Sequence, residues 1–286
     1  MGTMARAARS GYDTDLTEVQ WALVEPFVRA AYSGLGPYHR VSRRAVVDAI
    51  LYQNRTGCQW RLLPRDVPNW HPVRHYYDTG RADGTWEALN ALVRAQAGKE
   101  PTPSTPWVLL IVDSQSARTT EMGGEVGVDG GKKVKGRKRQ LAVDSTRARV
   151  PGLLWRVRVH AANVADCVGG WLLLEDCVGR FGRLVKVLAD SAYGRGDLWE
   201  RVRDELGCEL DVAERPAGAT TFVVQRARWI VEQSIACLGR DRRLAKDYEY
   251  TNSSSEARVL IAAIGRSLHR LAPGPAQRHG CNRSIA

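Results

Sequence analysis

The sequence lacks paired cysteines and long apolar runs, and each absence excludes a class of protein. Its six cysteines are scattered without a C-x-x-C pair, so neither a zinc site nor a disulfide framework is indicated. No apolar stretch approaches the roughly 20 residues that cross a bilayer. The N-terminus carries arginines but no apolar core, unlike a secretory signal. We therefore expect a reduced, cytoplasmic protein with no membrane partner.

Several catalytic motifs are also missing, whereas positive charge is in excess. Ser114 and Ser116 have no G-x-S-x-G setting, and no P-loop or G-x-G-x-x-G occurs, so serine hydrolase and nucleotide-binding chemistry are unsupported. The 42 Lys and Arg outnumber 31 Asp and Glu, giving a net charge of +11. Such a surplus attracts polyanions, which makes nucleic acid the first partner to consider. Charge alone does not decide, because many basic proteins bind no DNA.

The 286 residues are enough for one large or two modest domains. The stretch AGKEPTPSTP, with its three prolines, is the clearest linker. On each side of it the periodicity differs, from helical before it to strand-like after it. We predict five segments: a disordered tail (1–15), a helical DNA-binding region (16–97), a linker (98–106), an α/β catalytic domain (107–272) and a C-terminal tail (273–286).

Capping residues predict where the helices of the 16–97 region begin. Thr17 with Gln20 forms a capping-box pattern, and Ser42, Asn69 and Asp83 can each cap a further helix. The third helix displays a basic face that includes Arg74 and His75. This arrangement resembles a helix-turn-helix that enters the major groove of DNA. A plain helical bundle with solvated charges remains an equal alternative.

After the linker, apolar runs predict strands and a longer period predicts helices. The expected order is βββαβαβα, which suits a mixed α/β sheet covered by helices. The strands are expected at 107–113, 139–144, 153–160, 184–190 and 208–212, and the helices at 166–180, 195–206, 226–240 and 253–271.

Three acidic residues are candidates for a metal site. Asp113 and Asp190 each close an apolar strand, where open α/β sheets place their sites. Glu232 lies beside the apolar stripe of the 226–240 helix, one turn after Arg228. Three converging carboxylates would suit two Mg²⁺ ions, which activate attack at phosphorus. The alternatives are turn-forming aspartates and a surface i,i+4 ion pair.

Two basic clusters are candidates for contact with the DNA backbone. Cations at this density suit a polyanion, although a solvated hairpin or a localisation tract would look the same. The run GGKKVKGRKRQ supplies Lys132, Lys133, Lys135, Arg137, Lys138 and Arg139, and a second cluster after the 226–240 helix supplies Arg240, Arg242, Arg243 and Lys246.

Long stretches of the chain resemble bacterial insertion-sequence transposases of the DDE class, specifically insertion sequence family 5. The matching stretches are LTEVQWALVEPF, AILYQNRTGCQWRLLPRD, VDSQSARTT, GGKKVKGRKRQLAVD, VLADSAYG and RWIVEQSIACLGRDRRLAKDYE. By this resemblance the first Asp, second Asp and Glu of the family correspond to Asp113, Asp190 and Glu232. The chain departs from the family at Gln140, where histidine is usual, and at Ser191, where glycine is common.

The resemblance implies an RNase H-like catalytic fold and a DNA transposase. Such an enzyme would use two Mg²⁺ ions, or alternatively Mn²⁺, to cut double-stranded DNA at the inverted repeats of a transposon and join it to target DNA. Pairing two ends implies at least a dimer on DNA, in the bacterial cytoplasm at the nucleoid. Two rivals remain: an RNase H-like nuclease or resolvase that does not join strands, and a catalytically silent transposase-derived DNA-binding protein.

Overall fold

The structure is a computed structural model, in which the tertiary arrangement is described for most of the chain. The described residues are 11–33, 38, 40–97, 108–121, 123–144, 152–175, 184–213 and 228–274. The predicted linker and the larger part of both predicted tails lie outside them. Residues 11–15, expected to be disordered, are instead held against the helical region. The Tyr12 ring packs on Tyr52, and its hydroxyl donates to Asp66 at 2.8 Å.

The N-terminal region is helical, and local capping explains most of its boundaries. Thr17 and Gln20 form the predicted capping box, and the side chains of Ser42 and Asn69 cap the next two helices. Asp83 does not cap the fourth helix itself: Gly84 is its N-cap, while Asp83 accepts the Thr85 N–H at 2.9 Å. The elements are α1 (Glu18–Ala31), α2 (Arg43–Thr56), the short 3-10 helix η2 (Trp60–Leu62), α3 (Trp70–Ala82) and α4 (Thr85–Gln96).

A mixed sheet forms the centre of the region that follows the helices. β1 is parallel to β5, which is parallel to β6, while β3 is antiparallel to β1 on one edge and to β2 and β4 on the other. The strands are β1 (Val108–Arg118), β2 (Gly127–Asp129), β3 (Val134–Asp144), β4 (Leu154–Ala161), β5 (Leu184–Asp190) and β6 (Glu209–Ala213).

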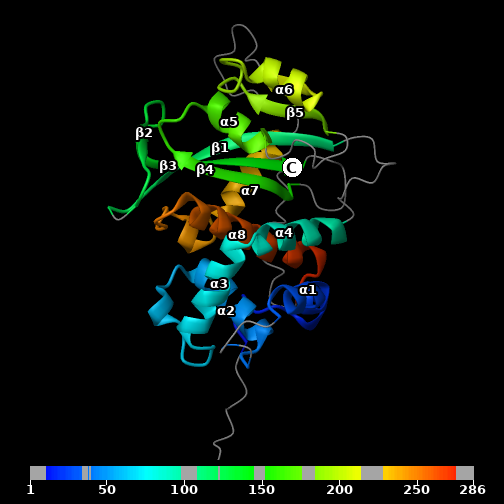
Figure 1. The fold of residues 1–286 in the computed structure, drawn as a ribbon, viewed down its shortest axis with the longest axis vertical. Helices are drawn as coiled ribbons and strands as arrows, with labels where there is room; N and C mark the ends of the chain where they lie inside the picture. The colour runs from blue at the N-terminus through cyan, green and yellow to red at the C-terminus, as the bar shows by residue number, and fades with distance from the viewer. Residues whose placement is uncertain are drawn as a thin grey trace, which may run out of the picture.

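Helices cover both faces of this sheet, so it separates two apolar cores. On one face, α5 and α6 pack on side chains such as Leu110 and Val112. On the other, α7 and α8 pack on side chains such as Ile111 and Leu141. Figure 1 shows α5 and α6 above the strands and α8 with α4 below them. The helices are α5 (Asp166–Glu175), α6 (Leu198–Leu206), α7 (Arg228–Leu238) and α8 (Asn252–Leu271), with the 3-10 helix η3 (Arg242–Leu244) before α8.

The helical region and the sheet share one core. The apolar cluster on the α8 face of the sheet continues through α8 into α1, α2, α3 and α4. α8 packs on α4 and on β4, and it also touches α1, α2 and α3. The N-terminal helices are therefore fixed against the sheet by packing, in addition to their covalent connection.

The outer edge of β4 is closed by side chains from α4 and α8. Glu256 Oε1 accepts the Val159 N–H at 2.9 Å, and Asn90 Nδ2 donates to the Leu154 carbonyl at 2.8 Å. Arg94 Nη1 lies 3.3 Å from the carbonyl oxygens of Leu154 and Trp155. Backbone groups that an edge strand normally leaves unpaired thus have partners within the chain.

Two strands are longer than the sequence indicates. β1 continues past Asp113 to Arg118, and β3 begins at Val134 rather than at 139. The two extensions pair with each other, Ser114 opposite Gln140 and Arg118 opposite Gly136. Their polar and charged side chains hid the strand from an apolar pattern. Among the described residues, no helix is both long and apolar enough to span a bilayer.

Candidate active site

Asp113 and Asp190 occupy neighbouring positions on two parallel strands. The last pair in the β1–β5 register is Ile111 with Leu188, and each aspartate lies two residues beyond it. Side chains two residues apart on a strand point to the same face. Ile111 and Leu188 contact the core on the α7 and α8 side, so both carboxylates lie on that side. β5 ends at Asp190 while β1 continues, so Asp113 marks the end of the parallel pairing rather than the end of its strand.

Backbone N–H groups orient both carboxylates. Asp113 Oδ1 accepts the Ser114 N–H at 2.7 Å, and Asp190 Oδ1 accepts the Ala192 N–H at 2.9 Å. The charges of both also act on the Tyr193 hydroxyl, whose pKa is raised by burial first and then by Asp113, Asp166 and Asp190. Because Asp113 and Asp190 both act on the pKa of this one buried hydroxyl, their carboxylates lie in the same region of the sheet.

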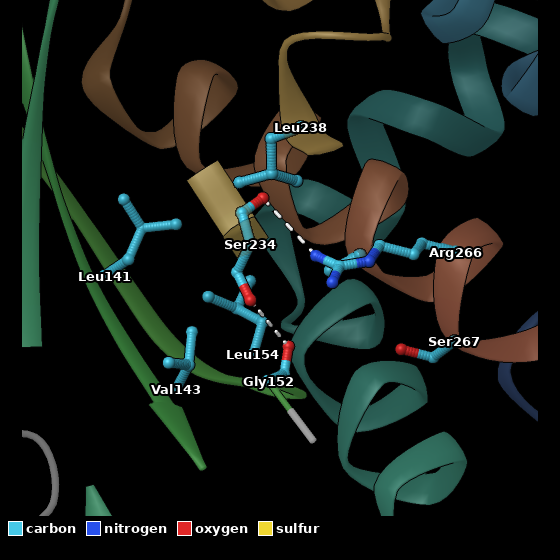
Figure 2. Close-up of a pocket in the computed structure, with 9 residues that line it drawn as sticks. Leu141, Val143, Gly152, Leu154, Ser234, Leu238, Arg266 and Ser267 are labelled. Carbon is cyan, nitrogen blue, oxygen red and sulfur yellow. Dashed lines mark hydrogen bonds between the residues drawn. The ribbon is translucent and has the colours of Figure 1, made fainter. Parts of the chain in front are cut away.

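Glu232 lies on α7, the helix that packs against β1 and β3 on the same face as the aspartates. Val231 on the neighbouring position is buried in the core, whereas Glu232 is exposed. Ser234 anchors the helix, because its hydroxyl donates to the Gly152 carbonyl at 3.1 Å (Figure 2). The same hydroxyl lies 2.8 Å from the Ile230 carbonyl, one turn earlier in α7. The adjacent cavity is lined by apolar side chains of β3, β4, α7 and α8 together with the polar side chains of Ser234, Arg266 and Ser267. Its volume is about 10 Å³, room for about one water molecule.

The structure pairs the two aspartates by register but does not gather a full metal-binding cluster. Among the described residues, no three His, Cys, Asp or Glu side chains lie close enough together to hold an ion. The donor chemistry nevertheless fits a hard cation, because carboxylate oxygens are the ligands that Mg²⁺ takes from proteins. Convergence of Glu232 with Asp113 and Asp190 stays a prediction.

Half of the predicted basic run is exposed, on a hairpin beside Asp113. Lys132 and Lys133 lie in the turn between β2 and β3, and Lys135 follows at the start of β3. Asp129 fixes this turn: it accepts the Lys132 N–H at 3.0 Å and the Ser116 hydroxyl at 2.5 Å. These hydrogen bonds outweigh burial and lower the pKa of Asp129. Three exposed lysines are thus held close to the stretch of β1 that follows Asp113.

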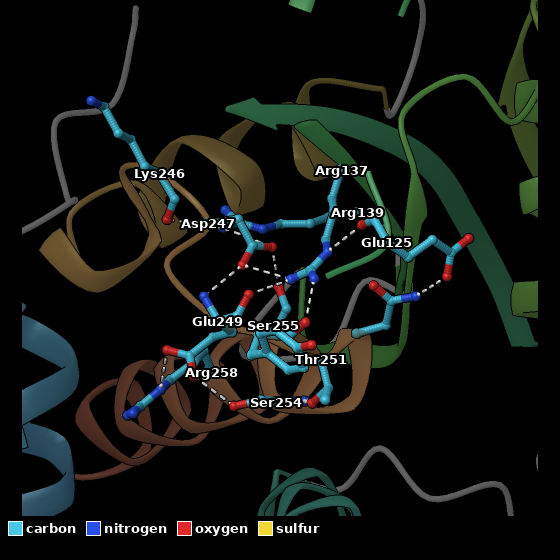
Figure 3. Close-up of polar contacts among 12 residues, drawn as sticks. Glu125, Arg137, Arg139, Lys246, Asp247, Glu249, Thr251, Ser254, Ser255 and Arg258 are labelled. Carbon is cyan, nitrogen blue, oxygen red and sulfur yellow. Dashed lines mark hydrogen bonds and ion pairs between the residues drawn. The ribbon is translucent and has the colours of Figure 1, made fainter. Parts of the chain in front are cut away.

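The other half of the run is buried, which corrects the prediction that these residues contact DNA. Arg137 and Arg139 point to the α8 side of the sheet, where both pair with the buried Asp247, at 3.3 and 3.9 Å (Figure 3). Lys138 points to the opposite face and pairs with Asp166 at 3.1 Å. All three have internal partners and little access to solvent. The ion pairs of Arg137 and Arg139 connect the sheet to Asp247. The ion pair of Lys138 connects it to α5.

A segment of residues 241–251 carries the acids that receive these arginines. Glu249, two residues after Asp247, pairs with Arg243 at 2.7 Å. It also pairs with Arg258 at 3.1 Å (Figure 3). Burial acts to raise the pKa of Glu249, but the two arginines and Ser254 lower it overall. Arg258 Nη1 also donates to Gln53 of α2 at 2.6 Å. The segment therefore links β3, α8 and the N-terminal helices through buried charges.

Comparison with known families agrees with this arrangement of an N-terminal helical region before a mixed sheet. Residues 106–265, more than half of the chain, match the family described as a transposase DDE domain. The chain belongs to the DDE transposases. Residues 16–90 match a second family, described as transposases of the IS4/5 family. The expectation of an insertion-sequence transposase of the DDE class is thereby confirmed.

A curated relative points to the same kind of mobile element. The transposase is 29% identical over 119 residues to an uncharacterised 16.2 kDa protein of insertion element IS402 from Burkholderia cepacia. The match covers 37% of this chain and 75% of that protein. Transposases act on DNA, so the family identifies the polyanion that the net positive charge suggested.

The remaining basic residues of the transposase differ in accessibility. Arg74 and His75 lie on the exposed face of α3, where Arg74 pairs with Asp78 at 3.2 Å. Arg240 is exposed after α7, whereas Arg243 is half-buried and held by Glu249, which assigns Arg243 to the internal network rather than to the surface. Arg228 is the first residue of α7, and its side chain lies outside the described residues.

The sequence pattern did not reveal a polar cluster that lies behind the aspartate pair. Tyr193, Gln140 and Asp166 are brought together beneath α5 by hydrogen bonds between distant parts of the chain. The available signal was a departure from pattern: Gly169 and Gly170 are consecutive glycines inside a helix, where glycine is unfavourable. Gln140, where the family usually has histidine, lies at the centre of this cluster.

Proposed function

We propose that this transposase catalyses metal-dependent DNA cleavage and strand transfer at the inverted repeats of its transposon. The observation that carries the proposal is the placement of Asp113 and Asp190 on adjacent parallel strands, two residues past the last registered pair and on one face. In the sequence these residues are far apart, and only the β1–β5 pairing makes them neighbours. The α7 helix with Glu232 packs on that same face.

Asp113, Asp190 and Glu232 would hold the divalent ions. Bound Mg²⁺ or Mn²⁺ supplies charge neutralisation and activates the oxygen that attacks phosphorus. The chain itself holds two carboxylates in fixed orientations through the N–H groups of Ser114 and Ala192. Without bound cations, closely placed carboxylates would repel one another, and the pKa of at least one would rise.

Exposed cations on both sides of the site would bind the DNA backbone. Lys132, Lys133 and Lys135 on the β2–β3 hairpin lie beside β1 just past Asp113, because Lys132 Nζ donates to the Ser114 carbonyl at 3.2 Å. On the helical region, the exposed α3 face with Arg74 and His75 would meet the terminal repeats. Arg240, and Arg228 at the start of α7, would add phosphate contacts near Glu232.

The fold and assembly that we propose follow the same logic. The antiparallel β4, β3 and β1, continued by the parallel β5 and β6, support an RNase H-like catalytic domain. A transposon has two ends, so the reaction calls for at least two copies of the chain on DNA. Soluble, cytoplasmic action at the nucleoid would place the enzyme with its substrate.

Conservative substitution of the aspartates tests the proposal. Asp113→Asn and Asp190→Asn keep the side-chain volume but remove the charge that binds a cation. We therefore expect cleavage of transposon-end DNA in Mg²⁺ to fall by roughly 100- to 1,000-fold, which is what loss of a major charge-stabilising group costs. Asp204→Asn is the matched control, because Asp204 is an exposed α6 residue that pairs with the neighbouring Arg203. Native-level cleavage by Asp113→Asn would rule out the assigned ligand.

Two further measurements separate the rival functions. A pre-cut transposon end with a free 3′-OH tests joining alone: an RNase H-like nuclease or resolvase would leave it unjoined, whereas a transposase inserts it into target DNA. Titration of Mn²⁺ into the purified chain tests the silent DNA-binding alternative. Absence of binding, with intact binding of transposon-end DNA, would favour that alternative over the enzyme.

A further inference from the structure

A buried tyrosine hydroxyl lies behind the aspartate pair, on the opposite face of the sheet. Tyr193 follows Asp190 by three residues and is almost fully buried. Its hydroxyl donates to Gln140 Oε1 in the middle of β3. We define the Tyr193 cluster as Tyr193, Gln140, His160 and Asp166, which come from the turn after β5, from β3, from β4 and from α5. The cluster therefore ties together four elements around the end of β5.

The direction of each hydrogen bond in the cluster is fixed by its partners. Gln140 Nε2 lies 3.3 Å from Asp166 Oδ1 and 3.3 Å from His160 Nε2. His160 Nδ1 lies 2.9 Å from the Ala161 carbonyl, so Nδ1 carries the hydrogen and Nε2 accepts. The amide nitrogen of Gln140 thus has two acceptors, and its oxygen must face Tyr193. The only polar hydrogen of the phenol is on its oxygen, so the Tyr193 hydroxyl donates to Gln140 Oε1.

The turn between Asp190 and Tyr193 connects the fixed tyrosine side chain to the Asp190 carboxylate. The Tyr193 N–H donates to the Asp190 carbonyl at 3.1 Å, and the Ala192 N–H donates to Asp190 Oδ1 at 2.9 Å. Two hydrogen bonds therefore close the turn of residues 190–193. The buried tyrosine side chain holds the last residue of this turn in place. Movement of Tyr193 would displace Ala192 and release one oxygen of Asp190.

Two glycines of α5 allow the helix to approach the cluster. A Cβ on Gly170 would lie 2.7 Å from the Tyr193 ring, and a Cβ on Gly169 would clash with His160 and Gln140. Glycine inside a helix costs about 1 kcal/mol each relative to alanine. The helix carries this cost at the two positions that contact the cluster, so its close packing there confines the tyrosine ring.

We propose that Tyr193 is a positioning residue that holds the Asp190 carboxylate in its metal-binding orientation through the hydrogen bond to Gln140. The inference rests on the proposed function, in which Asp190 is a metal ligand. Groups behind a ligand typically change metal affinity or activity by 10- to 100-fold when they are removed. Tyr193 packs on the α5 and α6 face of the sheet, opposite the two carboxylates, so its effect on Asp190 passes through the turn.

The test removes only the hydroxyl, in the full-length protein. For Tyr193→Phe we expect Mn²⁺ to bind roughly 10-fold more weakly by calorimetry, and the Ala192 amide to exchange faster with solvent in the metal-free protein. Gln140→Leu should reproduce both effects, and the double variant should be no worse than Gln140→Leu alone, because that change already removes the hydrogen bond to Tyr193. Tyr32→Phe is the matched control: its buried hydroxyl donates to the Tyr76 carbonyl at 3.2 Å in the helical region.

The two readouts separate failure of this inference from failure of the proposed function. If Asp190→Asn loses Mn²⁺ while Tyr193→Phe binds it like the native chain, Tyr193 does not position the ligand and the inference is overturned. If the native chain binds no Mn²⁺, the proposed function fails, and amide exchange at Ala192 alone then decides whether Tyr193 holds the turn. Equal effects in Tyr32→Phe would also overturn the inference, since they would show a general loss of stability.

Discussion

At the residue scale, Asp247 balances two buried arginines of β3. It accepts from Arg137 Nη1 at 3.3 Å and from the Ser255 hydroxyl at 2.6 Å, while Arg139 lies 3.9 Å away. Burial lowers the pKa of Arg139, and Asp247 is the first group that opposes this effect. An arginine rarely loses its proton in a protein, so the pair depends on its acid to remain charged inside the molecule.

Replacing Asp247 with asparagine should therefore cost much of the stability of the fold. Asp247→Asn leaves two buried guanidinium groups without their shared counter-charge, and we expect a loss of about 3–5 kcal/mol in the free energy of unfolding. Urea denaturation followed by circular dichroism measures it. The exposed control Asp204→Asn should leave the midpoint where it is. If the urea midpoint of Asp247→Asn equals that of the native chain, the ion pairs of Asp247 with Arg137 and Arg139 contribute no stability.

Asp241 is a buried carboxyl whose titration should change stability with pH. Burial raises its pKa to about 6, although Arg55 and a hydrogen bond with Asn54 act in the opposite direction. Between its ordinary value of 3.8 and 6, the folded state holds the proton more tightly than the unfolded state. The contribution of Asp241 to stability is thus fully present below pH 3.8 and is lost as the pH rises through 6.

A variant without the titration should lack this pH dependence. The loss amounts to at most about 3 kcal/mol, from roughly 1.4 kcal/mol per pH unit. We expect Asp241→Asn to be more stable than the native chain at pH 7, and their difference to shrink as the pH falls to 4. Urea midpoints of both proteins over pH 4–7 measure it. If the urea midpoints of the two proteins change with pH in parallel, the pKa of Asp241 is the same in the folded and the unfolded state.

At the element scale, α5 shows packing that outweighs helix propensity. Propensity alone predicts that Gly170→Ala gains about 1 kcal/mol. We expect a loss of about 1–3 kcal/mol instead, as in other overpacked cores, because the new Cβ would meet the Tyr193 ring at 2.7 Å. Gly265→Ala in α8 is the control, where the Cβ meets only the flexible end of Leu51, at 3.1 Å. Thermal unfolding of both variants decides, and a stabilised Gly170→Ala would contradict the packing described.

Elements whose signals are local could be predicted from the sequence. Thr17, Ser42 and Asn69 cap helices through bonds to residues two or three positions away, so their patterns are visible in a short window. The β5 strand was likewise predicted with its observed ends, 184 to 190, because its apolar run is continuous. The capping of α4 was misplaced by one residue, since Asp83 and Gly84 share that role.

Elements that depend on distant partners could not be predicted in the same way. The basic start of β3 is buried only because Asp247, more than 100 residues later, returns to neutralise Arg137. When that partner is not known, the run GGKKVKGRKRQ predicts side chains that are exposed to solvent or that contact DNA. For the candidate site, the strand-end pattern identified Asp113 and Asp190, and their register makes them neighbours. Tyr193 and Gln140 were missed, because their hydrogen bond joins positions 53 residues apart.

At the scale of the whole molecule, the shared core makes the helical region part of the folding unit. Tyr77 of α3 donates to the Ser254 carbonyl at 3.0 Å, and Gln53 of α2 accepts from Arg258. α8 thereby packs between the sheet and the N-terminal helices (Figure 1). The surface of α3 that we propose to bind DNA is thus held in a fixed position relative to the aspartate pair.

We expect the chain to unfold as one cooperative unit despite matching two families. A fragment of residues 98–286 would expose the apolar face of α8 and leave Arg258 without Gln53, so it should fail to fold or should aggregate. Calorimetry of the full chain should show one transition, and near-ultraviolet circular dichroism of the fragment should lack tertiary signal. Two separate transitions, or a fragment with native-like signal, would show that the regions fold independently.

The closed edge of β4 has a consequence for how copies of this protein meet. An open edge invites a second molecule to add its own strand and extend the sheet, which is the first step toward fibrous deposits. Here Glu256, Asn90 and Arg94 already occupy backbone groups along that edge. A strand of a second molecule would have to displace α4 and α8 before it could form hydrogen bonds with this edge of β4. Copies of the protein can therefore be crowded at high local concentration without this edge acting as a template for aggregation.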